Sequence, residues 1–249
     1  MNSALVSPAV YLEWDSQFFQ KRIGRVTTTN MLDQNADEVD AWANDNLIDC
    51  VYYLADGLES KSVRAAEVHN YHLMDLRVTY AIDLAKNKLD LSSELNIRMA
   101  LKEDLVEIKR MAGGFHGISR FFADDHFSRK KCTELYETWI ERDFNDTDRN
   151  LWVSEDQGII TGYTSASIIP NNNVAEIGLV GVNPNYRGQG IGYQLQLAVL
   201  NQIRQLGSNQ VEVVTQGRNI SAQNLYQKCG YHLKSIDLWY HKWFINNEN

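Results

Sequence analysis

VNPNYRGQGIG, residues 182–192, joins an apolar, strand-like run at residues 175–182 to an apolar-periodic helix expected over residues 191–206. A glycine-rich turn between a strand and a helix N-terminus lets several backbone N–H groups converge on one anion, and the positive end of the helix dipole favours phosphate there. A Cβ atom on these glycines would block the close approach of a diphosphate or forbid the turn itself. The stretch therefore predicts a phosphate-binding loop, which is called the phosphate cradle below.

Two other phosphate-binding loops do not fit the cradle. The P-loop pattern G-x-x-x-x-G-K-[ST] needs a Lys-Ser or Lys-Thr pair after the glycines, and the cradle has none. The dinucleotide pattern G-x-G-x-x-G needs a third glycine where the chain has Tyr193, and Glu212 lies inside the next expected strand rather than at its end. The spacing that remains is Arg187-x-x-Gly190-x-Gly192.

A second motif follows the cradle. Residues 211–215 predict a strand, and the helix after it can be capped by Ser221 and ended by Gly230 in a left-handed conformation. Tyr226 shares the apolar face of this helix and points towards the sheet. On the residues alone, the simplest interpretation is a tyrosine of the hydrophobic core. The face consists of Ala222, Leu225, Tyr226 and Cys229.

The two motifs, taken together in this order, resemble the GNAT superfamily of acetyl-CoA-dependent N-acetyltransferases. The resemblance implies that Asn219 contacts the pantetheine arm of acetyl-CoA and that Tyr226 protonates the departing CoA thiolate. It also implies that the strand before the cradle parts from its neighbour and offers backbone N–H groups to the thioester carbonyl. The expected cofactor-binding residues are Leu179, Val180, Gly181, Val182, Arg187, Gly188, Gln189, Gly190, Ile191, Gly192, Asn219, Asn224 and Tyr226.

The chain is expected to divide into two domains, residues 1–92 and residues 93–249. Residues 84–96 lose apolar alternation and carry Asn, Lys and Ser, as a connector does. The second domain then shows a short strand, a helix, a hairpin around residues 156–158 and a closing pair of strands at residues 231–235 and 239–244, which predict a mixed α/β fold. The resemblance implies a complete GNAT fold here, with a mixed, mostly antiparallel sheet flanked by helices.

The first domain resembles a truncated GNAT half. Strands are expected at residues 10–14, 50–55 and 71–80, with helices at residues 37–46 and 59–68 between them. The opening Trp14-Asp15-Ser16-x-Phe18-Phe19, together with residues 117–128, resembles the nucleotide-sugar amine acetyltransferases, the group that acts on sugars such as TDP-4-amino-4,6-dideoxygalactose (TDP-fucosamine).

The resemblance gives residues 117–128 a role in substrate binding. Arg120 can pair with a substrate diphosphate, and the nearby phenylalanines can stack on a nucleobase or cover the apolar face of a deoxysugar. The alternative is a surface arginine beside aromatic side chains that fill the interior. The expected substrate-binding residues are Arg120, Phe121, Phe122, Asp125, Phe127 and His72.

Two carboxylates are candidates for the base that deprotonates the acceptor amine. Asp75 matches an acidic position in the last strand of the extra half-domain, and Glu176 lies on the strand before the cradle, where other GNAT members keep one. Tyr226 completes the expected catalytic set. Either carboxylate can instead be a solvated or ion-paired surface group. His72 and His116 remain open as alternatives.

Composition favours a soluble, cytoplasmic enzyme. The 44% hydrophobic content is enough for a core, and the net charge of −8 argues against non-specific nucleic-acid binding. The apolar runs are too short to span a bilayer. The cysteines at positions 50, 132 and 229 fit neither a disulfide framework nor a zinc site, so no metal is expected. A homodimer is expected only because the resemblance to the family implies one.

The sequence thus predicts acetyl transfer from acetyl-CoA, by direct attack, to the amine of a nucleotide-linked amino-deoxysugar. A TDP-4-amino-4,6-dideoxyhexose fits best, with the product used for surface polysaccharide. Two alternatives stay open: a GNAT enzyme acting on another amine, such as an antibiotic, a polyamine or a protein N-terminus, and a non-catalytic module that senses acyl-CoA. The choice between TDP and UDP, the position of the amine on the sugar and the acyl-chain length are not determined by these residues.

Overall fold

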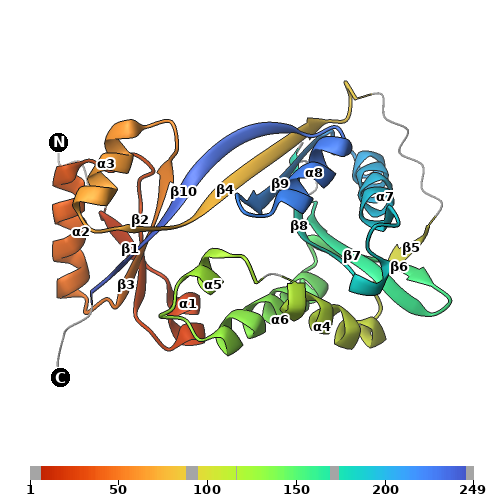
Figure 1. Ribbon diagram of the computed structural model, residues 1–249, viewed down its shortest axis with the longest axis horizontal. Helices are drawn as coiled ribbons and strands as arrows, with labels where there is room; N and C mark the ends of the chain where they lie inside the picture. The colour runs from red at the N-terminus through yellow and green to blue at the C-terminus, as the bar shows by residue number, and fades with distance from the viewer. Residues whose placement is uncertain (1–6, 88–94, 116, 169–173, 245–249) are drawn as a thin grey trace. The chain divides into compact units, whose positions relative to one another are not determined.

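The structure is a computed structural model that describes residues 7–87, 95–115, 117–168 and 174–244 (Figure 1). Two compact units make up the chain, and each is assembled from separate segments. Unit 1 comprises Met1–Arg77, Ala123–Phe127 and Ser235–Asn249, and unit 2 comprises Val78–Phe122 and Ser128–Lys234. The expected domain boundary between residues 92 and 93 lies outside the described residues and stays a prediction.

The sheet of unit 1 contains one parallel step, and a strand from late in the sequence pairs with its third strand. Antiparallel pairing joins β1 to β2, parallel pairing joins β2 to β3, and antiparallel pairing joins β3 to β10. The parallel step needs a crossover, which α2 supplies. The strand order is β1 (Ala9–Tyr11), β2 (Ile23–Val26), β3 (Cys50–Asp56) and β10 (His232–Trp243), and the helices are α1 (Glu13–Phe19), α2 (Asp33–Asp45) and α3 (Ser60–Val68).

Strand β3 is buried on both faces, which explains its continuous run of apolar residues. Val51, Tyr53 and Ala55 belong to the core cluster that also contains the buried residues of α2 and α3. Tyr52 points to the opposite face, where its ring packs against Phe127. Alternation along one strand thus gives unit 1 two packed faces.

Unit 2 is a three-layer arrangement of a mixed sheet between helices. Residues of α7 and α8 pack in one core cluster, and residues of α4 and α6 pack in another. The mixed α/β fold expected from the sequence is confirmed. The strand order is β9 (Gln210–Gln216), β8 (Val174–Val182), β7 (Ile159–Ser167), β6 (Arg149–Asp156) and β5 (Asn96–Met99), and the helices are α4 (Leu105–Phe115), α5 (Arg120–Ala123), α6 (Arg129–Asn145), α7 (Ile191–Gln205) and α8 (Ile220–Lys228).

The expected hairpin around residues 156–158 is confirmed as the β6–β7 turn. Gln157 and Gly158 both have positive φ, 47° and 82°, as a two-residue turn needs in order to match the twist of its strands. Strand β4 (His72–Asp83) lies next to β9 in the strand order on one side and next to β10 on the other. Both β4 and β10 contribute residues to each unit.

Two expected elements were wrong at their boundaries. The strand predicted over residues 10–14 ends at Tyr11, because Glu13 begins α1, where acidic residues favour the first turn. The pair of strands predicted over residues 231–235 and 239–244 is the single strand β10. Its pairing with β3 continues through Asp237 and Leu238, so the polar residues there do not break the strand.

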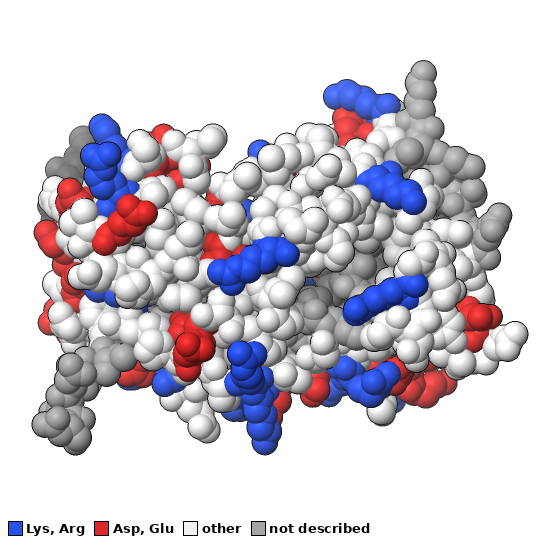
Figure 2. Space-filling view, viewed as in Figure 1, with Lys and Arg blue, Asp and Glu red and all other residues white. Residues whose placement is uncertain are grey.

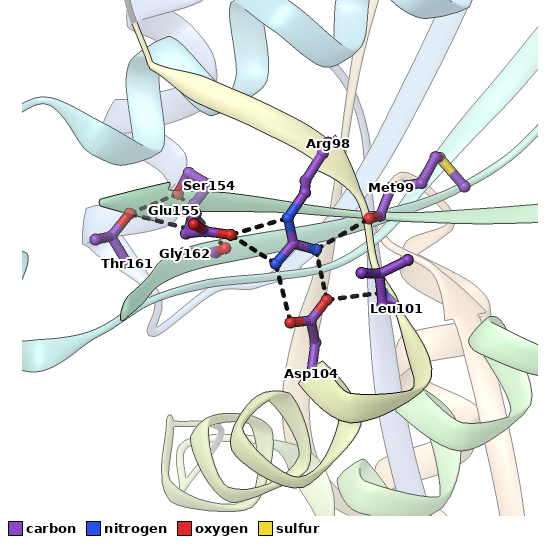
Figure 3. Close-up of polar contacts among 8 residues, drawn as sticks. All are labelled: Arg98, Met99, Leu101, Asp104, Ser154, Glu155, Thr161 and Gly162. Atoms are coloured by element: carbon purple, nitrogen blue, oxygen red, sulfur yellow. Dashed lines mark hydrogen bonds and ion pairs between the residues drawn. The ribbon is translucent and has the colours of Figure 1, made fainter. Parts of the chain in front are cut away.

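Arg98 joins the edge strand of unit 2 to the start of its first helix (Figure 3). Its guanidinium donates to both oxygens of Asp104, at 2.6 and 3.1 Å, and to Glu155 on β6, at 2.7 Å. Asp104 also accepts from the backbone N–H of Leu101, at 2.7 Å. The hydrogen bond from Arg98 lowers the pKa of Asp104, against the opposing effect of burial. The cluster therefore fixes where α4 begins.

We expect Arg98→Met to lower the free energy of unfolding by about 1–3 kcal/mol, because two carboxylates lose their shared cation. The matched control is Arg110→Met, which removes a solvent-exposed pair with Glu107 and should cost about 0.5 kcal/mol or less. Because the folded-state pKa of Asp104 is lowered, the Arg98 contribution is present above pH about 4 and is lost as the pH falls further. Urea unfolding at neutral and acidic pH measures both effects; equal costs for the two variants would contradict this account.

Candidate functional site

The phosphate cradle connects β8 to α7 through the 3-10 turn Pro184–Tyr186. Gly188 and Gly190 both have φ of +79°, a conformation that L side chains rarely adopt. A Cβ atom on either would meet no described heavy atom within 4 Å, so the space above the loop is open to a ligand. Gly190 precedes α7 without a side-chain cap, so its first-turn N–H groups lack a capping side chain.

Asn183 anchors the entrance of the cradle to β7. Its side-chain amide donates to the carbonyl of Ile160 at 3.3 Å, and its carbonyl oxygen accepts from the N–H of Asn185 at 3.2 Å. Its backbone N–H donates to Thr161 at 2.9 Å. The sequence analysis missed this residue, although an Asn before a Pro is a common signal of a side-chain-stabilised turn.

Arg187 supplies the positive charge of the cradle. It is exposed, as are Gly188, Gln189 and Gly190, and its Nε donates to the carbonyl of Val182 at 3.3 Å. The face of the molecule in Figure 2 carries scattered Lys and Arg side chains rather than a continuous basic patch. An anionic ligand at the cradle can pair with this arginine and with the backbone amides of the loop.

Strand β8 leaves β9 before the cradle. Parallel pairing ends at Ile177 and Val213, although both strands continue beyond these residues. On the other side, the register with β7 shifts between Thr164 and Ala166. The backbone N–H of Leu179 donates to the hydroxyl of Ser165 at 3.0 Å, so this expected cofactor-binding group is engaged within the protein. The departure itself agrees with the implied splayed strand.

Helix α8 places Tyr226 inside unit 2. Asn219, and not Ser221, caps the helix: its side chain accepts from the N–H of Ala222 at 3.2 Å. The Ser221 hydroxyl instead donates to Asn219, also at 3.2 Å. Gly230 has φ of 86°, as expected for the residue that ends the helix. Asn224, an expected cofactor ligand, is exposed.

Tyr226 is 4% exposed and lies between two other tyrosines. The centres of its ring and the Tyr80 ring are 6.1 Å apart, and that of Tyr231 is 5.7 Å away. Burial raises the pKa of Tyr226, so its hydroxyl is protonated at neutral pH. Its hydroxyl has no hydrogen-bond partner within the described residues. The core position and the capacity to give a proton are thus compatible.

Comparisons with known proteins identify this part of the chain. Residues 115–231, which include the cradle and Tyr226, match the model of the acetyltransferase (GNAT) family. The range contains the splayed strand, the cradle helix and the capped helix described above, and it is called the GNAT segment below.

Curated relatives share this segment at low identity. The spore coat polysaccharide biosynthesis protein SpsD of Bacillus subtilis is 26% identical over 125 residues, 50% of this chain and 43% of the relative. A mycothiol acetyltransferase of Saccharomonospora viridis is 31% identical over 111 residues, 42% of this chain and 35% of the relative. The chain therefore spans less than half the length of these relatives.

A solved structure extends the likeness to the fold of nearly the whole chain. A GCN5-related N-acetyltransferase from Sphaerobacter thermophilus covers 94% of this chain and 76% of its own, with a TM-score of 0.66 and 18% identity. At this identity the likeness shows the fold alone.

Glu176 lies on β8 of the GNAT segment and is exposed. Its neighbours Ala175 and Ile177 face the core cluster of α7 and α8, so Glu176 points to the opposite face of the sheet. Its strand partners are Ser167 and Glu212. Glu212 is itself paired with Lys234, which leaves Glu176 as the solvated carboxylate of the two.

The start of the predicted substrate segment packs into unit 2. Phe121 is 4% exposed, and the Arg120 guanidinium lies over its ring at 4.1 Å. Phe122 is partly buried and stacks near Tyr136 at 6.5 Å. This placement agrees with the packing alternative for the two phenylalanines, while Arg120 remains only partly buried. His116 lies outside the described residues.

The other predicted substrate residues belong to unit 1. Asp75 is 5% exposed, and its Oδ1 accepts from the N–H of Leu76 at 2.8 Å, whereas His72 is exposed at the start of β4. Asp125 is exposed. Phe127 is 5% exposed and packs against Phe19, with ring centres 4.5 Å apart. The structure thus assigns Asp75 and the GNAT segment's Tyr226 to different units.

A buried carboxylate that the sequence analysis missed holds residues 123–127 in unit 1. Asp124 is 2% exposed, and its Oδ2 is 2.6 Å from His241 Nδ1 and 2.9 Å from Trp243 Nε1. Its Oδ1 accepts from the N–H of His126 at 3.0 Å. Burial raises the pKa of Asp124, but these hydrogen bonds outweigh it and hold the pKa well below its usual range. Asp124 therefore has a structural role.

Within the described residues, no helix has the length and apolar character needed to cross a bilayer, and no three potential metal-ligating side chains come together.

We expect Asp124→Asn to destabilise unit 1 by about 2–4 kcal/mol, because the amide turns one acceptor into a donor that faces existing donors. Asp125→Asn, at the exposed neighbouring position, is the matched control and should change stability by about 0.5 kcal/mol or less. Thermal unfolding with tryptophan fluorescence reports the difference, since Trp243 contacts Asp124. Identical melting of the two variants would show that the buried hydrogen bonds do not stabilise the unit.

Proposed function

We propose that the protein is an acetyl-CoA-dependent N-acetyltransferase that transfers the acetyl group directly to an amine. The observation that carries this proposal is the combination, in one GNAT segment, of an open glycine cradle and a buried, protonated Tyr226. Either feature alone has a structural explanation. Together they supply an anchor for a diphosphate and a proton donor for a leaving thiolate.

The residues of the cradle fit the diphosphate of acetyl-CoA. Gly188 and Gly190 leave open space where side chains would stand, and the first-turn N–H groups of α7 lack a capping side chain. Arg187 adds an exposed cation that can pair with phosphate oxygens. Acetyl-CoA, when bound, supplies an activated thioester. The protein's part is to hold it, polarise its carbonyl and return a proton to its sulfur.

Three groups of the chain are assigned to these steps. Those backbone N–H groups of residues 180–182 that point away from β7, beyond the point where β8 leaves β9, are proposed to donate to the carbonyl oxygen. Tyr226 is proposed to protonate sulfur, and its raised pKa keeps the proton available over the physiological range. Glu176, exposed on β8, and Asp75, buried in unit 1, are both proposed as bases, since an amine attacks only as its free base.

The cysteines favour direct attack over a cysteine-bound acetyl intermediate. Cys50, Cys132 and Cys229 are all buried. Burial raises the pKa of Cys229 to about 12, so the thiolate needed for nucleophilic attack is scarce at neutral pH. The amine of the acceptor is therefore the nucleophile in this proposal.

A nucleotide-linked amino-deoxysugar is the proposed acceptor, with a TDP-4-amino-4,6-dideoxyhexose as the first choice. The sequence resemblance of residues 10–19 and 117–128 supports this choice. The similarity to a relative named for spore coat polysaccharide biosynthesis supports it further. Arg120, partly exposed on α5, is the proposed contact for the sugar's diphosphate. The similarity to mycothiol acetyltransferases supports a second candidate, an acceptor amine outside the nucleotide sugars.

The experiment is CoA thiol release from acetyl-CoA with a panel of acceptors, beside calorimetric titration of acetyl-CoA alone. The panel holds TDP-4-amino-4,6-dideoxygalactose, its glucose epimer, a UDP-4-amino sugar, spermidine and a simple aminoglycoside. We expect rapid turnover with one nucleotide sugar and little turnover with the other amines. Turnover confined to spermidine or the aminoglycoside would refute the sugar assignment, and acetyl-CoA binding without turnover on any acceptor would favour a sensor. Absence of acetyl-CoA binding would refute the whole proposal.

A further inference from the structure

A chain of hydrogen bonds inside unit 2 links α6, β7 and β8. It begins at Asp143, a carboxylate that is 1% exposed on α6. Oδ2 of Asp143 accepts from the hydroxyl of Ser165 on β7, at 2.6 Å. The Ser165 oxygen in turn accepts from the backbone N–H of Leu179 on β8, at 3.0 Å. None of these contacts is explained by the packing of the core alone.

The direction of each hydrogen bond in this chain is fixed. A carboxylate can only accept, so Ser165 must give its single proton to Asp143 and turn a lone pair towards Leu179. The other oxygen of Asp143 accepts from Arg142 at 2.7 Å and lies 3.5 Å from Arg149, so the carboxylate cannot rotate freely. The hydroxyl of Ser165 is therefore locked in the one orientation that satisfies the N–H of Leu179.

This contact lies at the irregularity of the sheet. The register between β7 and β8 shifts between Thr164 and Ala166, which places Ser165 at the shift. A Cβ atom on Gly178 would lie 2.5 Å from the Ser165 hydroxyl oxygen and 3.3 Å from Asp143 Oδ2. The backbone of β8 thus comes close to the two side chains, and only glycine permits this approach.

The irregularity directly precedes the backbone that the proposed reaction uses. Bulges of this kind bend a strand and redirect the groups that follow. Strand β8 has left β9 at Ile177, and there the Ser165 hydroxyl accepts the backbone N–H of Leu179, while the Leu179 side chain packs against the core cluster of α4 and α6. Three residues after Leu179, β8 ends at Val182, and the chain continues through Asn183 into the rest of the cradle.

We propose that Asp143 and Ser165 are positioning residues for acetyl transfer: through Leu179 they hold the bulge of β8 so that those N–H groups of residues 180–182 that point away from β7 face the thioester carbonyl. The inference rests on the proposed function and deepens it. Neither side chain touches the reacting atoms; each acts through the backbone. Loss of the restraint should therefore weaken recognition of the acetyl group while leaving the cradle, and hence the CoA moiety, in place.

The test compares Ser165→Ala with Ser154→Ala, a control that removes another buried strand hydroxyl, one bonded to Thr161 at 2.8 Å. Amide hydrogen exchange of Leu179 should become about tenfold faster in Ser165→Ala and stay unchanged in the control. The preference for acetyl-CoA over CoA, measured by calorimetry, should fall about fivefold with little change in CoA affinity. On the best acceptor, kcat should fall about 10- to 100-fold, whereas the KM for acetyl-CoA should rise by no more than about the same factor of five.

Asp143→Asn is the second variant, and it keeps the shape of the side chain. The asparagine amide has one acceptor oxygen, whereas Asp143 accepts through both of its oxygens. Either the Ser165 hydroxyl or the Arg142 guanidinium, which are both donors, therefore faces the donating NH2 group of the amide. Leu179 exchange should quicken here as well, by a smaller factor than in Ser165→Ala. Folding of each variant is checked by its melting temperature beside Ser154→Ala.

Two results would overturn the inference: Leu179 exchange in Ser165→Ala no faster than in Ser154→Ala, or faster exchange with an unchanged preference for acetyl-CoA over CoA. Both measurements need no acceptor, so they remain decisive if no turnover is found. Failure of the proposed function is a separate result, in which the wild-type protein does not bind acetyl-CoA at all.

Discussion

The separation of β8 from β9 after Ile177 is the constraint on which the candidate site depends. Two parallel strands that stayed paired would satisfy each other's backbone groups along their whole length, and none would be left for a ligand. Here β8 leaves its neighbour, is held on its other side by β7, and runs into a loop anchored by Asn183. The backbone N–H donors at the end of β8 are therefore followed, a short way along the chain, by those of the first turn of α7.

Burial serves both the fold and the proposed chemistry of the GNAT segment. Tyr226 fills the core between Tyr80 and Tyr231, and the same burial raises its pKa. A protonated phenol beside an apolar core is a proton donor that water cannot easily titrate. Asp143 shows the reverse case, because a buried carboxylate is tolerated only with partners, and those partners tie α6 to β7 and β8.

Local patterns predicted the parts of the molecule that depend on neighbouring residues. The glycines of the cradle, the turn at Gly158 and the inward face of α8 follow from spacing alone, and the structure has all three. The prediction that Ser221 caps the helix was wrong, because Asn219, two residues earlier, is the N-cap and accepts from the N–H of Ala222. The contacts of Asp124 and Ser165 join residues more than ten positions apart, so no local pattern reveals them. The resemblance assigned roles to residues of both units, but it gave no information on the contacts of their side chains.

Turnover of Tyr226→Phe beside Tyr231→Phe tests the central claim most directly. The two tyrosines are buried in one cluster, and the Tyr231 hydroxyl is buried without a hydrogen-bond partner among the described residues, so its loss is a matched control for packing. The account predicts that Tyr226→Phe lowers kcat about 100-fold while acetyl-CoA affinity stays within about threefold, and that Tyr231→Phe keeps near-normal turnover. Equal turnover in the two variants would contradict the role of Tyr226 as the proton donor and leave it a tyrosine of the core.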